Sequence, residues 1–136
     1  MLIISFSWTT PAVVAEVKRV TRRDWDREYA KFFTKNMLCQ AYDKSPRVGG
    51  KQFGVIKLTR EPYLESTAIA PAIDYRLEGF EHLTRIGATV QGMTPAELWD
   101  EWHVRPQVLY VVRFRLVELT KYGEVLRMEP KQTKMT

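Results

Sequence analysis

Residues 5–25, with the sequence SFSWTTPAVVAEVKRVTRRDW, decide the fold that we predict for this chain. The apolar alternation that leads into this stretch predicts a strand with at least one buried face. Thr9 or Thr10 can then cap a short helix, because Pro11 fits a first helical turn, where no backbone donor is needed. A basic turn and a second extended segment follow. The stretch therefore predicts a strand, a helix, a turn and a strand.

The basic turn places four cationic side chains around one hydroxyl group. Lys18, Arg19, Arg22 and Arg23 flank Thr21. Alternate side chains of an extended backbone share a face, so Thr21 would lie beside Arg19 and Arg23. A hydroxyl among cations is typical of an anion-binding site or of an activated nucleophile. The alternative is that Lys18 and Thr21 only shape the turn.

The pattern of residues 18–23 resembles the opening of ASCH domains, a family of the PUA-like group. A second similarity is the Glu-Gly-Phe turn at residues 78–80, and a third is the helix start at residues 94–99 ahead of a final strand. Together these motifs cover most of residues 2–119. The resemblance implies an α+β fold, in which a PUA-like small curved β-barrel carries short flanking helices.

The length and composition indicate a single domain. The chain has 136 residues, of which 45% are hydrophobic, and this is enough for one core. We expect an ASCH/PUA-like domain over residues 1–127 and a frayed, polar tail over residues 128–136. The net charge of +5 and the sequence pI of about 9.4 favour acidic partners such as nucleic acid or nucleotides.

Several kinds of site and location are not expected. Cys39 is the only cysteine, which excludes an intrachain disulfide and a cysteine metal cluster. His82 and His103 lack metal-ligand spacing, and the sequence carries no dinucleotide fingerprint, so we expect no metal and no cofactor. No apolar run approaches the roughly 20 residues of a membrane helix, and no basic leader precedes the first strand. We therefore expect a cytoplasmic protein that does not bind a membrane.

The regular elements are predicted from periodicity and from caps. Aromatic residues at spacings of three and four predict a helix over residues 24–36, and a threonine cap followed by proline predicts another that begins at Thr94. Alternating apolar residues predict a long strand over residues 107–119. The other expected elements are a strand at 51–59, an extended segment at 61–69 and a short helix at 80–86.

The resemblance also offers an alternative, which is an enzyme. Small bacterial ASCH amidohydrolases, which deacetylate N4-acetylcytidine, use a lysine, a threonine and a glutamate, and Lys18 and Thr21 match the first two by motif. Gln91 stands near the position of the family glutamate, and a glutamine cannot accept a proton at neutral pH. Glu78 is then the preferred carboxylate, ahead of Glu81, provided that the fold returns it to the basic turn. The alternative for Glu78 is a structural role, in which it holds that turn in place.

Three functions are compatible with this pattern. The first is binding of RNA, single-stranded nucleic acid or a modified nucleotide in a basic cleft. The second is an amidohydrolase that removes an acyl group from a nucleoside such as N4-acetylcytidine. The third, which is not catalytic, is a protein-interaction domain that meets an acidic partner. The residues predicted to bind nucleic acid, unless they are solvated, ion-paired or part of the core, are Trp8, Arg19, Arg22, Arg23, Arg113 and Arg115.

Overall fold

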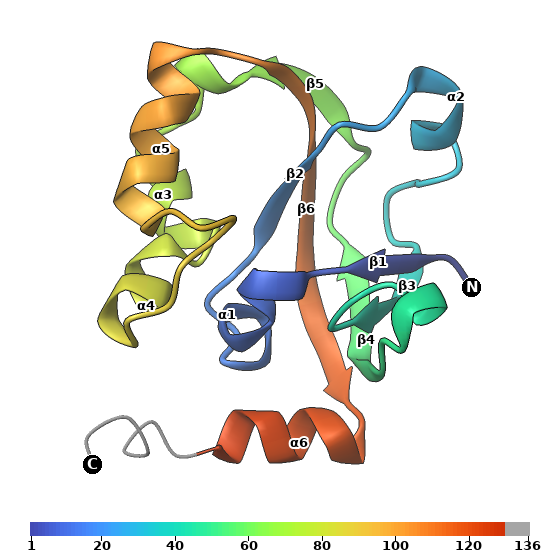
Figure 1. Ribbon diagram of the computed structural model, residues 1–136. Helices are drawn as coiled ribbons and strands as arrows, with labels where there is room; N and C mark the ends of the chain where they lie inside the picture. The colour runs from blue at the N-terminus through green and yellow to red at the C-terminus, as the bar shows by residue number, and fades with distance from the viewer. Residues whose placement is uncertain (130–136) are drawn as a thin grey trace.

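The computed structural model describes residues 1–129 and has an α+β fold (Figure 1). Within these residues six strands form one curled, mixed sheet in the order β1-β3-β4-β6-β2, with β5 beside β6. The sheet makes a half-barrel whose two edge strands are β1 and β2, which bears out the expected curved α+β fold. The strands are β1 (Ile3–Ser5), β2 (Val20–Arg23), β3 (Leu38–Tyr42), β4 (Gln52–Leu58), β5 (Tyr63–Ser66) and β6 (Val108–Leu119).

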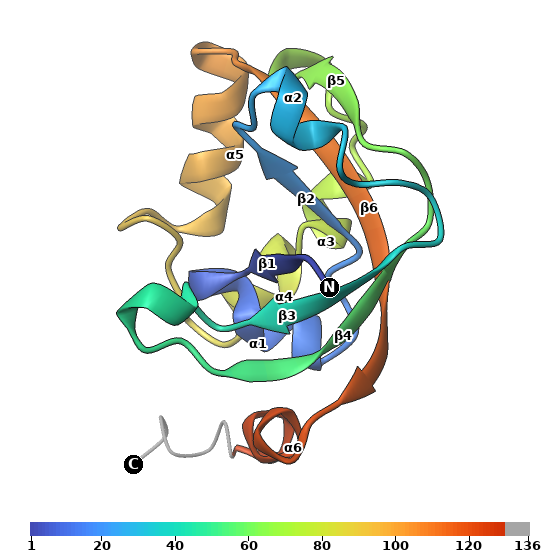
Figure 2. The same cartoon turned by 90° about the vertical axis from the view of Figure 1, so that its right-hand side faces the viewer.

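Strand β6 organises the sheet and confirms the strand predicted at residues 107–119. It pairs with β2 on one side and with β5 and β4 on the other, antiparallel in each case. Its inward side chains Val112 and Phe114 are buried. The register with β4 shifts between Val55 and Ile56, and such a bulge increases local bending. Figure 2 shows β6 curving along the whole length of the molecule.

Short helices cover the sheet, and α3, α4 and α5 gather on one side of it (Figure 1). The helix predicted to begin at Thr94 is confirmed with its capping box, because the Thr94 hydroxyl accepts from the Glu97 N–H and the Glu97 carboxylate accepts from the Thr94 N–H. The helix expected at 80–86 is present as well. The α-helices are α1 (Thr10–Val14), α2 (Arg27–Ala30), α3 (Asp74–Leu77), α4 (Phe80–Arg85), α5 (Pro95–Val104) and α6 (Lys121–Met128).

The helix predicted over residues 24–36 is wrong, since only α2 is helical there. Trp25 and Phe33 stack with ring centroids 4.3 Å apart, and Phe33 is buried in the core while Phe32 is exposed. The backbone reverses at Asn36, whose φ is +72°, to enter β3. The aromatic spacing thus reflects a local cluster in a turn, which uses the same residue types as a helical stripe.

Helix α6 was not predicted. The Thr120 hydroxyl caps it by accepting from the Gly123 N–H, and a Cβ at Gly123 would lie 2.0 Å from the Phe53 carbonyl oxygen. The helix therefore packs directly against β4, and only glycine allows this approach. Met128 ends α6, and residues 130–136 of the predicted tail lie outside the described residues.

Two apolar clusters fill the interior. The first lies inside the curl of the sheet and is closed by α1 and α6, and the second joins α1 to α4 and α5. Helix α1 contributes to both, with Val13 and Val14 in the first and Ala12 in the second. The segment that follows α1 is thereby fixed between the two clusters. No helix within residues 1–129 is long and apolar enough to span a membrane.

Candidate functional site

A pocket of about 270 Å³ opens where the two edge strands of the half-barrel approach each other. One wall is the segment from Ser5 to Thr9 at the end of β1, a second wall is β2, and the remaining lining comes from α4, α5 and the residues next to these helices. These strands do not pair with each other. Instead, the Arg23 guanidinium donates from Nη2 to the Ser5 carbonyl oxygen at 2.7 Å and bridges the seam. The pocket therefore occupies the one seam of the described sheet that a side chain closes.

Lys18 reaches the pocket because the chain turns sharply after α1. Glu16 has a φ of +62°, and the N–H groups of Val17 and Lys18 both donate to the Ala12 carbonyl oxygen at 3.0 Å. This turn sends the Lys18 side chain inward, where it is buried. Its Nζ donates to the Glu78 carboxylate Oε1 at 2.8 Å and to the Glu78 carbonyl oxygen at 2.9 Å.

Glu78 returns to the basic turn through the Glu-Gly-Phe motif. Gly79 has a φ of +90°, and a Cβ there would lie 2.4 Å from the Ala12 Cβ. Only glycine allows both this backbone conformation and the close approach of α1. The sequence condition for a catalytic role of Glu78 is met, since Lys18, Thr21 and Glu78 all line the same pocket.

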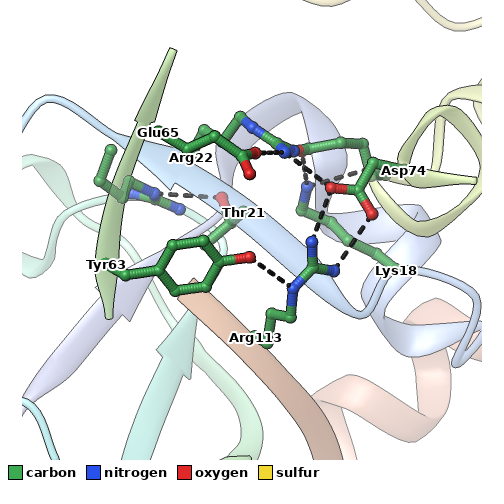
Figure 3. A network of polar contacts seen from close by, with 9 residues as sticks. Lys18, Thr21, Arg22, Tyr63, Glu65, Asp74 and Arg113 are labelled. Atoms are coloured by element: carbon green, nitrogen blue, oxygen red, sulfur yellow. Dashed lines mark hydrogen bonds and ion pairs between the residues drawn. The ribbon is translucent and has the colours of Figure 1, made fainter. Parts of the chain in front are cut away.

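Arg22 also lines this pocket, and its two terminal guanidinium nitrogens are paired with carboxylates (Figure 3). Its guanidinium donates to Glu78 Oε2 at 2.7 Å, to Asp74 Oδ2 at 2.6 Å and to Glu65 Oε1 at 3.0 Å. Its side chain is buried. Burial alone would lower the pKa of Arg22, but Glu78 and Asp74 raise it, so the guanidinium stays charged. Both Glu78 carboxylate oxygens therefore carry a cationic donor.

A second arginine completes the network from β6. Arg113 donates to the two Asp74 carboxylate oxygens at 3.1 and 2.8 Å and to the Tyr63 hydroxyl at 3.0 Å (Figure 3). Asp74 is completely buried. Burial alone would raise the pKa of Asp74, but the hydrogen bonds from Arg113 and Arg22 lower it below 3.8. Asp74 is thus an ionised bridge between two arginines.

Lys18 differs from Arg22 in its electrostatic balance. Burial lowers the pKa of Lys18 below 10.5, and the attraction of Glu78 offsets this only in part, while the charges of Arg23 and Arg22 lower it further. A lysine of this kind gives up its proton more easily than an exposed one, which is the property that a general base needs.

Arg23 is the cation of the pocket whose bonded partners are all neutral. Its Nε donates to the Thr21 hydroxyl at 3.2 Å, and its Nη2 donates to the Ser5 carbonyl oxygen. Its guanidinium also lies 5.4 Å from the centre of the Phe6 ring. Within residues 1–129 no carboxylate forms an ion pair with Arg23, and burial lowers its pKa to about 10. A positive charge without a carboxylate partner therefore lines the pocket.

The rim of the pocket combines an aromatic and an amide side chain. Trp8 lines the pocket and is 53% exposed, so it is not part of the core. Gln91 is exposed and also lines the pocket, in a tight turn where its φ is +54°. Gln91, which the resemblance places near a family glutamate, is therefore part of the pocket lining.

The structure does not bring the predicted arginines together in one groove. Arg22 and Arg113 are both paired with Asp74. Arg115 is exposed away from the pocket, and Arg19 lines a different cavity. Buried carboxylates from distant segments of the chain neutralise two of the five arginines, Arg22 and Arg113.

Three site residues, Asp74, Glu65 and Tyr63, were missed by sequence analysis. They follow Arg22 by 41 to 52 residues along the chain, and no local pattern marks them. The one available signal was the position of Asp74 four residues before Glu78, which places both carboxylates on the same side of a helical turn. Among the described residues, no group of three or more His, Cys, Asp or Glu side chains is arranged to hold a metal ion.

Comparison with known proteins gives no further identification of the site. No family model, no curated protein and no solved structure matches the chain.

Proposed function

We propose that this protein binds a single nucleotide unit, either free or within RNA or single-stranded DNA, in the pocket between β1 and β2. The observation that carries the proposal is the convergence of an exposed indole, an arginine without a carboxylate partner and a buried lysine on one pocket. The similarity of residues 18–23 and 78–80 to ASCH domains supports the same function.

The size and lining of the pocket favour one base over a long strand. A volume of about 270 Å³ suits a ligand of nucleobase or nucleoside size. Trp8 offers an indole face at the rim, and base–aromatic stacking is worth about 1–3 kcal/mol per base. The Gln91 amide provides both a donor and an acceptor for a base edge. A duplex would not present a base to such a pocket without unstacking it.

The charge of the pocket favours an anionic group on the ligand. Lys18 and Arg22 are matched by the Glu78 carboxylate, whereas Arg23 contacts only neutral oxygens. A guanidinium held in place by two hydrogen bonds is already oriented for a phosphate oxygen. Binding would thus use few phosphate contacts and depend mainly on the base.

Binding of a fluorescently labelled oligonucleotide should weaken about tenfold or more when Trp8 is replaced by alanine, because one stacked base is lost. The logarithm of affinity should fall with the logarithm of salt concentration with a slope of only about −0.7 to −1.4, as for one or two phosphate contacts with a single strand. Fluorescence anisotropy at several salt concentrations measures both quantities.

Phe32→Ala is the matched control for Trp8→Ala, because Phe32 is 62% exposed and lies outside the pocket. This control should bind with wild-type affinity. Arg22→Ala is unsuitable as a binding variant because the Arg22 side chain is buried among carboxylates. Equal affinity of wild type, Trp8→Ala and Arg23→Gln would contradict the proposed site.

A second candidate function, hydrolysis of an acylated nucleoside, is favoured by the presence of Lys18, Thr21 and Glu78 in one pocket. In this reaction water adds to the acyl carbon, the bond from that carbon to the amide nitrogen breaks, and the nitrogen receives a proton. The products are a carboxylic acid and the free amine. The chain needs a base for the first proton and a cation for the developing oxyanion.

Different residues can fill these two roles. Lys18, whose pKa is lowered by burial, is the candidate base that takes a proton from the attacking water, and the Thr21 hydroxyl is the candidate group that orients this water. Arg23, which donates to the Thr21 hydroxyl and has no carboxylate partner, is the candidate cation for the oxyanion. Glu78 orients Lys18 through the contact at 2.8 Å. The lysine is then not required to act both as a neutral base and as a charged oxyanion partner.

Acetate release from N4-acetylcytidine tests this second function, with separation of the nucleosides as the readout. If the wild type turns over, Lys18→Ala and Thr21→Ala should each abolish turnover, and Glu78→Gln should reduce it by about 100-fold, the usual scale for a proton-transfer group. Thr89→Ala is a control for the threonine change, because Thr89 is exposed and does not line the pocket. Activity that survives Lys18→Ala would overturn the mechanism, and a folded wild type without turnover would leave binding as the function.

A further inference from the structure

A second cavity, of about 230 Å³, lies on the other side of the basic turn from the nucleotide pocket. Its walls are the turn after α1 together with α3 and α4. Its charged lining consists of three arginines, Arg19, Arg76 and Arg85, with Glu16 and Glu81, and His82 also lines it. Neither the sequence pattern nor the proposed nucleotide site accounts for this group of arginines.

The backbone fixes the direction of Arg19. Its N–H donates to the Leu77 carbonyl oxygen at 2.7 Å, and its own carbonyl oxygen accepts from the Phe114 N–H at 3.0 Å. Neighbouring side chains in an extended segment point to opposite sides. Lys18 points into the nucleotide pocket, so Arg19 points away from it, into the second cavity. The two sites therefore lie back to back across residues 18–19 and 77–78.

The carboxylates of this cavity do not neutralise its arginines. Arg19 and Arg76 form no ion pair and no side-chain hydrogen bond anywhere in the described part of the chain. Arg85 approaches Glu81 only to 3.9 Å. Glu16 is already paired at 2.9 Å with Arg127, which lies outside the cavity. One loosely held carboxylate thus faces three guanidinium groups.

Like charges that line the same cavity repel each other. An anion that binds between them reduces this repulsion. Guanidinium groups bind phosphate oxygens in paired hydrogen bonds, which a halide ion cannot form. The three arginines come from three separate segments, namely the turn before β2, α3 and α4. A tetrahedral oxyanion is the ligand that can accept from donors in several directions.

We propose that Arg19, Arg76 and Arg85 form a phosphate-binding site that is separate from the nucleotide pocket. The ligand chemistry is a phosphate group, and it can have two sources. One is free phosphate or diphosphate, and the other is a phosphodiester of a strand that continues past the nucleotide pocket. This site does not depend on the proposed nucleotide pocket, because none of its three arginines lines that pocket.

The test compares the double variant Arg19→Gln/Arg76→Gln with wild type and with Arg27→Gln/Arg47→Gln. The second pair removes the same charge from exposed positions outside both cavities. Inorganic phosphate and pyrophosphate are titrated by calorimetry, and a labelled single-stranded oligonucleotide by anisotropy. Thermal unfolding of each variant shows that it is folded, and exposed arginines make wild-type stability the expected result.

Pyrophosphate should bind to wild type and to the control, and the Arg19/Arg76 variant should lose about tenfold or more of this affinity. Oligonucleotide binding that falls by a similar factor in that variant, with no binding of free pyrophosphate, would assign the site to a phosphodiester and also support it. Unchanged affinity of the variant for both pyrophosphate and oligonucleotide would overturn the phosphate site. That result would leave the Trp8 experiment, and therefore the nucleotide pocket, unaffected.

Discussion

Replacing Asp74 with alanine is expected to lower the free energy of unfolding by about 3–5 kcal/mol, the range for breaking a buried ion pair from one side. Asp74 is completely buried and accepts from both Arg22 and Arg113. Without Asp74, Arg22 still has Glu78 and Glu65 as partners, but Arg113 keeps only the Tyr63 hydroxyl. A half-buried guanidinium without a carboxylate partner is the source of the loss.

Chemical denaturation with urea, followed by circular dichroism, measures this change. Glu101→Ala is the control, because the Glu101–Arg105 pair has a similar distance of 2.7 Å but lies on the exposed face of α5, where such pairs contribute less than about 1 kcal/mol. The double variant Asp74→Ala/Arg113→Met should recover part of the stability, since it removes the stranded charge. A single variant Asp74→Ala as stable as Glu101→Ala would show that the network does not stabilise the fold.

Replacing Gly79 with alanine is the second change with a large expected effect. The backbone there has a φ of +90°, which costs a residue with a Cβ roughly 1–2 kcal/mol. The added Cβ would also lie 2.4 Å from the Ala12 Cβ, and overpacking of this kind costs about 1–3 kcal/mol. We therefore expect a loss of about 2–5 kcal/mol in the free energy of unfolding, if both costs add.

Gly87→Ala separates the two contributions to this loss. Gly87 has a φ of +73°, but a Cβ there would meet nothing within 4 Å, so only the backbone cost remains. The Gly79 variant should also bind oligonucleotide more weakly, because α1 must move away from the residues beside Lys18 and Glu78. Denaturation and anisotropy give the two readouts. Equal stability of the two variants would mean that α1 moves aside without cost.

The parts of the fold that sequence analysis predicted correctly are those with local causes. The helix at Thr94 has its own cap, and the long strand has its own alternation. The helix over residues 24–36 failed because stacked aromatics, such as Trp25 on Phe33, imitate helical spacing. The spacing of apolar residues indicates which of them are buried, but it does not show the backbone conformation that connects them.

The site was predicted in its local part and missed in its long-range part. Lys18 and Thr21 share a short segment, and Gly79 marks the turn that returns Glu78, so these residues could be found. The buried state of Arg22 could not, because its carboxylate partners follow it by 43 to 56 residues. An arginine is expected in solvent unless its partner is known, and the partner is defined only by the folded sheet.

The seam between β1 and β2 has a consequence for how the molecule accommodates ligands of different size. Opening a fully paired barrel breaks a row of backbone hydrogen bonds, whereas this seam is closed by the Arg23 contact with the Ser5 carbonyl oxygen. Breaking this hydrogen bond costs about 1.5–3 kcal/mol, the usual contribution of a hydrogen bond to a charged group. A ligand anion that accepts from Arg23 replaces the broken bond. The two edge strands of the half-barrel can thus separate at the seam without breaking backbone hydrogen bonds between paired strands.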